Sequence, residues 1–134
     1  MSTIYRASEY CDARIGFSFS EDRQTAEAYR HNPGFGGRNL YSVDVDLDGV
    51  LDLTDVSDEW AALSEAAGIE IDPAKYQHHF ARVLPTSEAI CEALAAAGYH
   101  WVRFNDDYPE GAITIIPVSD DAADAADSDL EECE

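Results

Sequence analysis

The sequence predicts an α+β fold, a small and mostly antiparallel sheet or split sandwich with helices beside it. The predicted elements are mixed along the chain: two strands, a helix, a glycine-rich loop, two strands, three helices and two further strands. Some links between strands are very short, which favours antiparallel pairing. With 134 residues, of which 46% are hydrophobic, the chain is long enough for one domain with its own core.

Two short strands are predicted at the start of the chain, over residues 3–7 and 16–20. The first combines β-branched and aromatic residues, which suit a pleated, half-buried surface. In the second, Phe17 and Phe19 alternate with serines, the pattern of a strand with one buried face. Arginines on strands mostly face solvent, but Arg6, near the middle of the first strand, can also line a binding cleft.

A helix is predicted after the second strand, over residues 23–30. Ser20 or Asp22 can cap it, because a short side-chain oxygen accepts hydrogen bonds from the free amides of a first helical turn. A loop with three glycines and one aromatic residue follows, over residues 31–37. A serine-bearing strand, a helix and a glycine-rich loop can form the floor of a ligand site. The same residues also suit a plain strand–turn–helix corner with a flexible loop.

Residues 40–47 alternate apolar and polar side chains and predict a strand. An Asp-Gly pair then predicts a tight turn into a second short strand over residues 50–53, as in a hairpin. The aspartates of residues 44–55 also fall at the spacing of a calcium loop. We favour the strands over a metal site, because no amphipathic helix precedes the segment and Asp55 replaces the longer glutamate at the last ligand position.

Three helices and two strands are predicted over the rest of the globular part. Periodic apolar residues, capping residues and helix-ending glycines indicate where they begin and end. The helices cover residues 57–67, 72–83 and 86–97, and the strands cover residues 99–104 and 112–116. The last strand is a nearly continuous apolar run, which predicts a central position in the sheet.

The predicted globular domain covers residues 1–118, and residues 119–134 form an acidic C-terminal tail. The tail holds eight acidic residues and no basic one. Its Ala-Ala-Asp triplets have some helix propensity, but the like charges oppose a helix. We therefore expect a mostly solvated tail, or one that folds on a basic partner.

The chain is strongly acidic, since 28 acidic and 8 basic residues give a net charge of −20. Such a field repels nucleic acids and anionic membranes, so we expect direct binding to neither. It suits a protein partner with a basic surface, and it also suits a simple solubility effect. No apolar run approaches the roughly 20 residues that span a bilayer. Residues 1–10 lack a signal-peptide pattern, and we expect an intracellular, cytoplasmic protein.

The three cysteines, Cys11, Cys91 and Cys133, show no Cys-x-x-Cys spacing. Neither a disulfide framework nor a zinc site is therefore indicated. Cys91 falls on a helical face and is expected to be a small core residue. Cys133 lies in the polar tail and is expected to be a free thiol.

Several of these segments together resemble the ADP-ribosyltransferase superfamily. The segments are Ile4-Tyr5-Arg6, Gly16-Phe17-Ser18-Phe19-Ser20 with Ala26 and Tyr29 in the next helix, residues 40–45, and Ala97-Gly98-Tyr99 before the acidic turn and last strand. The nearest branch is the small one of phages and mobile elements, which includes anti-CRISPR enzymes. The resemblance spans residues 3–118 and implies an ADP-ribosyltransferase-like split antiparallel β-sandwich with flanking helices.

The resemblance implies a binding site for NAD between two small sheets. In this family a first-strand arginine contacts the adenosine side or a ribose, a Ser-x-Ser strand supports the nicotinamide ribose, and an aromatic residue stacks on the nicotinamide. The residues of this chain assigned to the site on these grounds are Tyr5, Arg6, Ser18, Phe19, Ser20, Tyr29 and Phe35.

The resemblance also implies a catalytic carboxylate near the start of the last strand. Cleavage of the nicotinamide–ribose bond builds positive charge at C1′, and a fixed carboxylate stabilises that charge. Glu110 lies closest to the last strand and is the first choice, while Asp106 and Asp107 in the same turn are alternatives. The family's usual Glu-x-Glu pair is absent, because Glu110 is the only glutamate of this turn.

The function implied by the resemblance is an NAD-dependent ADP-ribosyltransferase, or an NAD glycohydrolase, that acts on a protein target. An antidefence role for a phage or mobile element is one setting. The alternative belongs to another class: a non-catalytic acidic inhibitor that occupies the basic, nucleic-acid-binding surface of a partner. Binding that weakens steeply with salt would favour the alternative.

Overall fold

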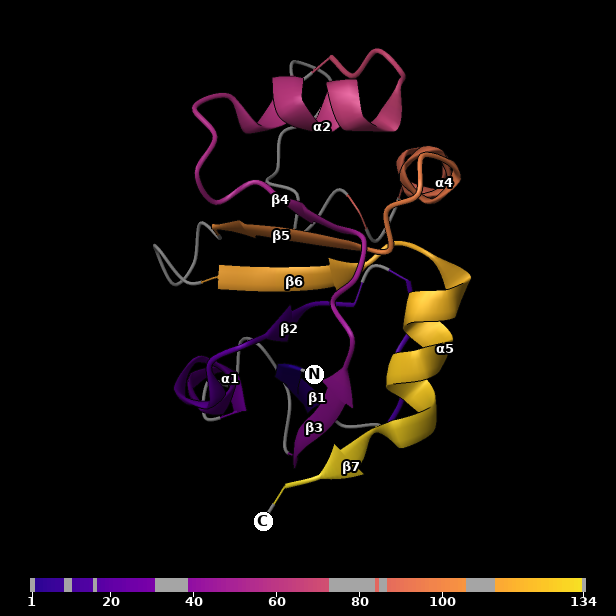
Figure 1. Ribbon diagram of the computed structural model, residues 1–134. Helices are drawn as coiled ribbons and strands as arrows, with labels where there is room; N and C mark the ends of the chain where they lie inside the picture. Colours follow the sequence, from indigo (N-terminus) through magenta and orange to yellow (C-terminus); the bar gives the residue numbers. More distant parts are fainter. Residues whose placement is uncertain are drawn as a thin grey trace.

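A seven-stranded sheet runs through the computed structural model of the protein (Figure 1). Its strands are β1 (Ser2–Ser8), β2 (Phe19–Ser20), β3 (Asn39–Val45), β4 (Val50–Asp52), β5 (Trp101–Asn105), β6 (Ile113–Pro117) and β7 (Glu131–Glu132). The helices of the described part are α1 (Arg23–Arg30), α2 (Glu59–Ala67), α4 (Glu88–Ala96) and α5 (Asp120–Asp129). The structure describes residues 2–8, 11–15, 17–30, 39–72, 84, 87–105 and 113–133.

The mixed α/β class is confirmed, and of the two predicted arrangements, a small sheet or a split sandwich, the described strands form a single sheet. The strand order is β4-β5-β6-β2-β1-β3-β7. The two-residue strand β2 is the link between two halves, because it pairs with β6 on one side and with β1 on the other. We call β4, β5 and β6 the β5 half, and β1, β3 and β7 the β1 half. The predicted central position of the last strand, β6, is also confirmed.

Strands β3 and β4 do not pair with each other, so the predicted hairpin is wrong. β4 pairs in parallel with β5 at one edge of the sheet, whereas β3 lies next to the other edge. The turn itself explains the separation, because the Gly49 carbonyl accepts a hydrogen bond from His100 N at 2.8 Å and so binds the start of β5. Gly49 has φ +69°, and a Cβ there would meet Gly98 O at 2.9 Å, so the position requires glycine.

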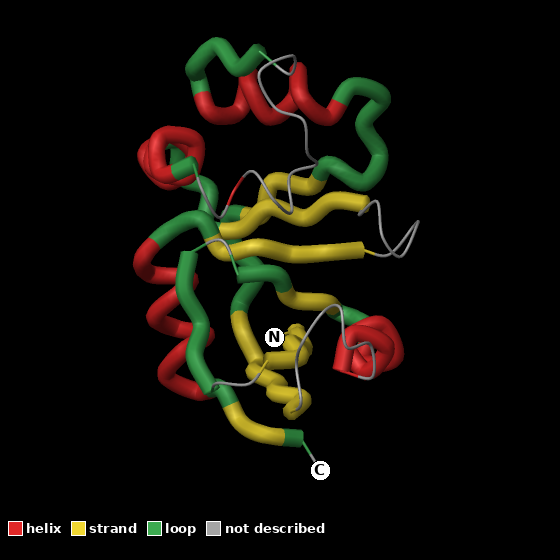
Figure 2. Tube along the Cα trace, turned by 180° about the vertical axis from the view of Figure 1, so that it is seen from behind, coloured by secondary structure: helices red, strands yellow, loops and turns green. Residues whose placement is uncertain are grey.

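The β1 half is built on a long antiparallel pair. Every residue of β1 lies opposite one of β3, from Ser2 and Val45 at one end to Ser8 and Asn39 at the other. Figures 1 and 2, seen from opposite sides, show α1 and α5 on opposite sides of these strands. The prediction of strands over residues 3–7 and 40–47 is therefore confirmed to within a few residues.

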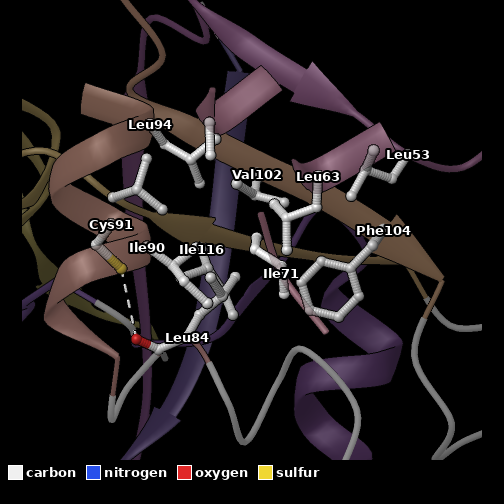
Figure 3. Close-up of a cluster of buried hydrophobic side chains, with 12 residues drawn as sticks. Leu53, Leu63, Ile71, Leu84, Ile90, Cys91, Leu94, Val102, Phe104 and Ile116 are labelled. Atoms are coloured by element: carbon white, nitrogen blue, oxygen red, sulfur yellow. Dashed lines mark hydrogen bonds between the residues drawn. The ribbon is translucent and has the colours of Figure 1, made fainter. Parts of the chain in front are cut away.

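Two hydrophobic clusters stabilise the sheet, one on each face. The first lies on the face that carries Val102, Phe104 and Ile116, which we call the α4 face because α2 and α4 cover it (Figure 3). Leu63 of α2 and Leu94 of α4 are fully buried in this cluster. The prediction that Cys91 is a core residue is confirmed: its thiol donates a hydrogen bond to the Leu84 carbonyl at 3.4 Å.

The second cluster lies on the opposite face, which we call the α5 face. It joins Ile4, Phe19, Trp101 and Ile115 from four strands to the buried side of α5. Successive residues of β5 and β6 face opposite ways, so these two strands contribute to both clusters. The two clusters therefore share strands β5 and β6.

The helix ends follow ordinary capping chemistry. Asp22 accepts hydrogen bonds from Gln24 N at 3.1 Å and Thr25 Oγ1 at 2.9 Å, and so caps α1 as predicted. Asp58, one residue after the expected start, caps α2 through Ala61 N. Gly68 ends α2 in the left-handed conformation, as predicted. The helix predicted over residues 72–83 falls almost wholly outside the described residues.

The C-terminal segment is acidic, but the expectation that it is mostly solvated is wrong. Residues 120–129 form α5, and Ser119 caps that helix through Ala122 N. Alanines on one side of α5 are buried against the sheet, and Ala126 is fully buried. β7 then pairs with β3 at the sheet edge. The charges do not prevent folding, because the aspartates lie on the outer side of the helix and the small alanines fit closely against the sheet.

Candidate functional site

Two strands from the start of the chain and one from the other end of the sequence lie side by side at the centre of the sheet. β2 carries Ser20 and lies between β1, with Tyr5 and Arg6, and β6, which follows the acidic turn. Tyr5 lies opposite Ser20, and Ser20 lies opposite Thr114. The segments that carry the predicted arginine, the predicted serine and the strand after the predicted acid are thus neighbours.

The register places a row of hydroxyl groups on one face of these strands. Opposite residues of paired strands project to the same face, so Tyr5, Ser20 and Thr114 share the face of Phe104, the α4 face. Ser42 extends the row onto β3. Ser20 and Thr114 are both only 4% exposed. Thr114 was missed from the sequence, although it is the single polar residue within the apolar run of β6.

Arg6 is held on the other side of the sheet. It lies opposite Tyr41, whose side chain belongs to the cluster of the α5 face. Its Nη1 donates a hydrogen bond to the Ser18 carbonyl at 2.9 Å, and its guanidinium lies 4.4 Å from the centre of the Phe17 ring. Arg6 therefore contacts the backbone of the Ser-x-Ser segment, while the Ser20 hydroxyl lies on the opposite face.

Arg6 lacks a carboxylate partner within the described part of the chain. By contrast Arg14 lies 3.6 Å from Asp12, and Arg103 lies 2.8 Å from Glu21. The buried Nε of Arg6 has no hydrogen-bond partner. Burial lowers the pKa of Arg6, and the charge of Asp12 offsets part of that effect. An unpaired buried donor costs about 1–3 kcal/mol, so its presence requires an explanation.

The Ser20 hydroxyl is fixed by the start of α1. Its Oγ accepts a hydrogen bond from Asp22 N at 3.1 Å. The hydroxyl proton remains able to donate, because that bond uses only an oxygen lone pair. Of the two predicted caps, Asp22 is the one that binds a first-turn amide of α1, and Ser20 binds the amide of Asp22 instead.

The remaining predicted residues divide into two groups. Phe19 is 2% exposed and its side chain is part of the α5-face cluster, so only its backbone is placed to contact a ligand. Tyr29 belongs to α1, but its side chain lies outside the described part of the structure. The predicted residues that lie wholly outside it are Phe35, Asp106, Asp107 and Glu110.

An ionic network lies beside the serine strand. Arg103 Nε donates to Glu21 Oε1 at 2.8 Å, and Arg103 Nη1 donates to Asp52 Oδ2 at 3.0 Å. Thr54 donates to Asp52 from its hydroxyl at 2.6 Å, and Asn105 Nδ2 donates to the Thr54 carbonyl at 3.0 Å. Burial alone would lower the pKa of Arg103, but the hydrogen bonds and charges of Glu21 and Asp52 outweigh it and raise the pKa.

An open groove of about 620 Å³ runs along α2 and the residues after it, and no predicted site residue lines it. Within the described ranges, no three histidines, cysteines or acids are grouped as a metal would require. Of the helices described, none has the length and apolar character needed to cross a membrane.

Comparisons with protein-family models, curated proteins and solved structures gave no match to this chain. The interpretation of the site therefore depends on its own residues.

Proposed function

We propose that the protein is an NAD-dependent ADP-ribosyltransferase, or an NAD-cleaving enzyme, that acts on a protein target. The proposed fold is an ADP-ribosyltransferase-like one, in which the β5 half and the β1 half correspond to the two small sheets and β2 joins them. NAD would lie against the row of Tyr5, Ser20 and Thr114.

The observation that carries the proposal is the adjacency of β1, β2 and β6. The resemblance needs an arginine strand, a Ser-x-Ser strand and a strand preceded by an acid, and these come from the two ends of the chain. They are consecutive in the sheet order. Hydroxyl groups in register on such strands can hold the hydroxyls of a ribose, since each can donate and accept.

Arg6 has a modified role in this proposal. It holds the Ser18 carbonyl and stacks on Phe17, so it orders the serine segment from behind. Because its side chain lies on the α5 face, behind the row of hydroxyls, its proposed role is to order that segment and not to contact NAD directly.

A proton NMR time course of the purified protein with NAD tests the proposal. Saturation transfer to NAD reports binding, and new signals of free nicotinamide report cleavage. The expected result is nicotinamide release that falls about 100-fold or more in Glu110→Gln, as for loss of one preorganised electrostatic group. Asp106→Asn tests the alternative acid, and Glu92→Gln, on the exposed side of α4, is the matched control. If the unmodified protein shows no saturation transfer to NAD and releases no nicotinamide, the proposal is contradicted.

A second candidate function is favoured by the fold of the acidic C-terminal segment. α5 and β7 present their acids on a defined outer surface, which is a suitable shape for a basic partner. We propose as the alternative a non-catalytic inhibitor that covers the nucleic-acid-binding surface of another protein. The exposed acids of this surface are Asp120, Asp121, Asp124, Asp127, Asp129, Glu131 and Glu132.

The alternative is tested by the salt dependence of partner capture. A triple variant with Asp124→Asn, Asp129→Asn and Glu132→Gln removes three outer charges and none of the buried alanines. Capture of one basic protein that disappears both at high salt and in this variant supports the inhibitor. Capture that persists in both conditions, or that requires NAD, contradicts it.

A further inference from the structure

We infer that Arg103 is a positioning residue that holds the serine strand β2 and the start of α1 in place through its ion pair with Glu21. The inference rests on the proposed function, because it assigns a role in NAD binding to a residue outside the hydroxyl row. The first observation behind it is that β2 is very short. Two residues offer few ladder hydrogen bonds, yet β2 is the strand between the two halves.

Arg103 reaches this junction from the β5 half. It lies opposite Ile115 of β6, and Ile115 lies opposite Phe19 of β2, so its side chain extends over the α5 face of the sheet toward the end of β2. There its Nε donates to Glu21, the residue directly after Ser20. The other arm of the guanidinium donates to Asp52 on β4. One side chain thus connects β4, β5 and the end of β2.

An ion pair at Glu21 restrains both the end of β2 and the start of α1. The residue before it, Ser20, carries the row's central hydroxyl, and the residue after it, Asp22, caps α1. The Ser20 hydroxyl itself bonds to Asp22 N, so the strand end and the helix start are one hydrogen-bonded unit. Fixing Glu21 therefore fixes both the hydroxyl that faces NAD and the helix that carries Tyr29.

The chemistry of the group explains why an arginine stands here. The planar fork of a guanidinium binds two separate carboxylates at once, whereas an ammonium is a single point charge. Arg103 is 23% exposed and its two partners are 35% and 47% exposed, so the pairs are partly screened and each contributes modestly to stability. Their main effect is to restrict where Glu21 lies.

The test separates the two arms of Arg103. The variants are Arg103→Gln, Glu21→Gln and Asp52→Asn, and Arg14→Gln is the control at an exposed arginine with its own ion pair. Amide hydrogen exchange of residues 19–24 is measured first, because it needs no NAD. Arg103→Gln and Glu21→Gln should each speed that exchange about fivefold, the factor for loss of one partly exposed ion pair, and the double variant should add little more.

The KM for NAD is the second readout, since a merely structural role would not change it selectively. Arg103→Gln and Glu21→Gln should raise KM about fivefold with kcat unchanged, and Asp52→Asn should change it less. Unchanged exchange in Glu21→Gln, or an Asp52→Asn effect equal to that of Arg103→Gln, would overturn the inference. If the unmodified protein neither binds nor cleaves NAD, the proposed function fails and the assigned role in NAD binding fails with it, whereas faster exchange would still show that Arg103 holds β2.

Discussion

The two halves of the sheet are assembled from different parts of the chain. The cluster of the α4 face is made of residues 53–118, so its elements follow one another in sequence. The cluster of the α5 face joins residues 4–45 to Trp101, Ile115 and residues 122–130, so it draws on both ends of the chain. The β5 half is thus a local unit, whereas the β1 half closes only when the C-terminal segment returns to it. The proposed site lies where the two meet, on β1, β2 and β6.

The largest expected effect comes from a charge placed under α5. Ala126 is fully buried against the α5 face, whereas Ala125 on the same helix is exposed. Ala126→Asp should lower the free energy of unfolding by more than about 3 kcal/mol, because it buries an unpaired carboxylate. Ala125→Asp should cost less than about 1 kcal/mol, as helix propensity and like charges alone predict. Urea denaturation measures both, and equal small effects would mean that α5 is a solvated tail.

A slightly smaller loss of stability is expected for a cavity in the cluster of the α4 face. The same variant tests whether the two halves unfold together. Leu94→Ala creates a cavity in the cluster of the α4 face and should cost about 2–5 kcal/mol. Trp60 packs against that cluster, and Trp101 is buried in the other one. Because β5 and β6 contribute to both clusters, Trp60→Phe and Trp101→Phe variants should report the same shifted transition by fluorescence. Two separate transitions would show that the halves are independent.

A modest pH effect should come from the ionic network at the edge of the β5 half. The hydrogen bond from Thr54 is the largest cause that lowers the pKa of Asp52 below its ordinary value of 3.8, and Arg103 adds to it. A lowered folded-state pKa contributes stability that is present above that ordinary value and is lost as pH falls through the folded-state pKa. Asp52→Asn should therefore cost less than about 1 kcal/mol at pH 7, and the difference should shrink below pH 4. Asp55→Asn, at an exposed turn, is the control, and a difference that grows in acid would contradict the account.

The last prediction involves no change in stability and concerns the reactivity of the three cysteine thiols. Burial raises the pKa of Cys91 to about 11, whereas Cys11 is exposed and Cys133 is half-buried. A thiol reagent at pH 8 should label Cys11 and Cys133 in the folded protein, and Cys91 only after denaturation. Mass spectrometry of the peptides measures the order, and early labelling of Cys91 would mean that the α4-face cluster is open.

The sequence predicted local elements well and long-range pairing poorly. Alternation and capping residues identified the strands and helices of the described ranges, because each signal lies within a few neighbouring residues. The hairpin after β3 was wrong since the Asp-Gly turn directs the chain to β5, about 50 residues further on. The expectation of a solvated acidic segment was wrong for a similar reason. The alanines of α5 are buried against a sheet that includes β3, and β3 lies about 80 residues earlier in the chain.

The arrangement of the residues assigned to the proposed site could be predicted only in part. A strand pattern identifies the residue types Tyr5, Arg6 and Ser20, and the resemblance gave them roles, but neither shows which face a side chain occupies. That depends on the register with β3 and β6, which separates Arg6 from the row of hydroxyls. Thr114 and Arg103 were missed, because a single polar residue in a strand gives no signal until its neighbours across the sheet are known.

The proposed binding of NAD where the two halves meet is tested most directly by amide chemical shifts. The protein is labelled with nitrogen-15 and titrated with NAD. The expected shifts concentrate at Tyr5, Ser18 to Ser20 and Thr114, with α2 and α4 unchanged. Absence of any shift at saturating NAD, or shifts centred on Ile69 and the groove of α2, would contradict the proposed binding.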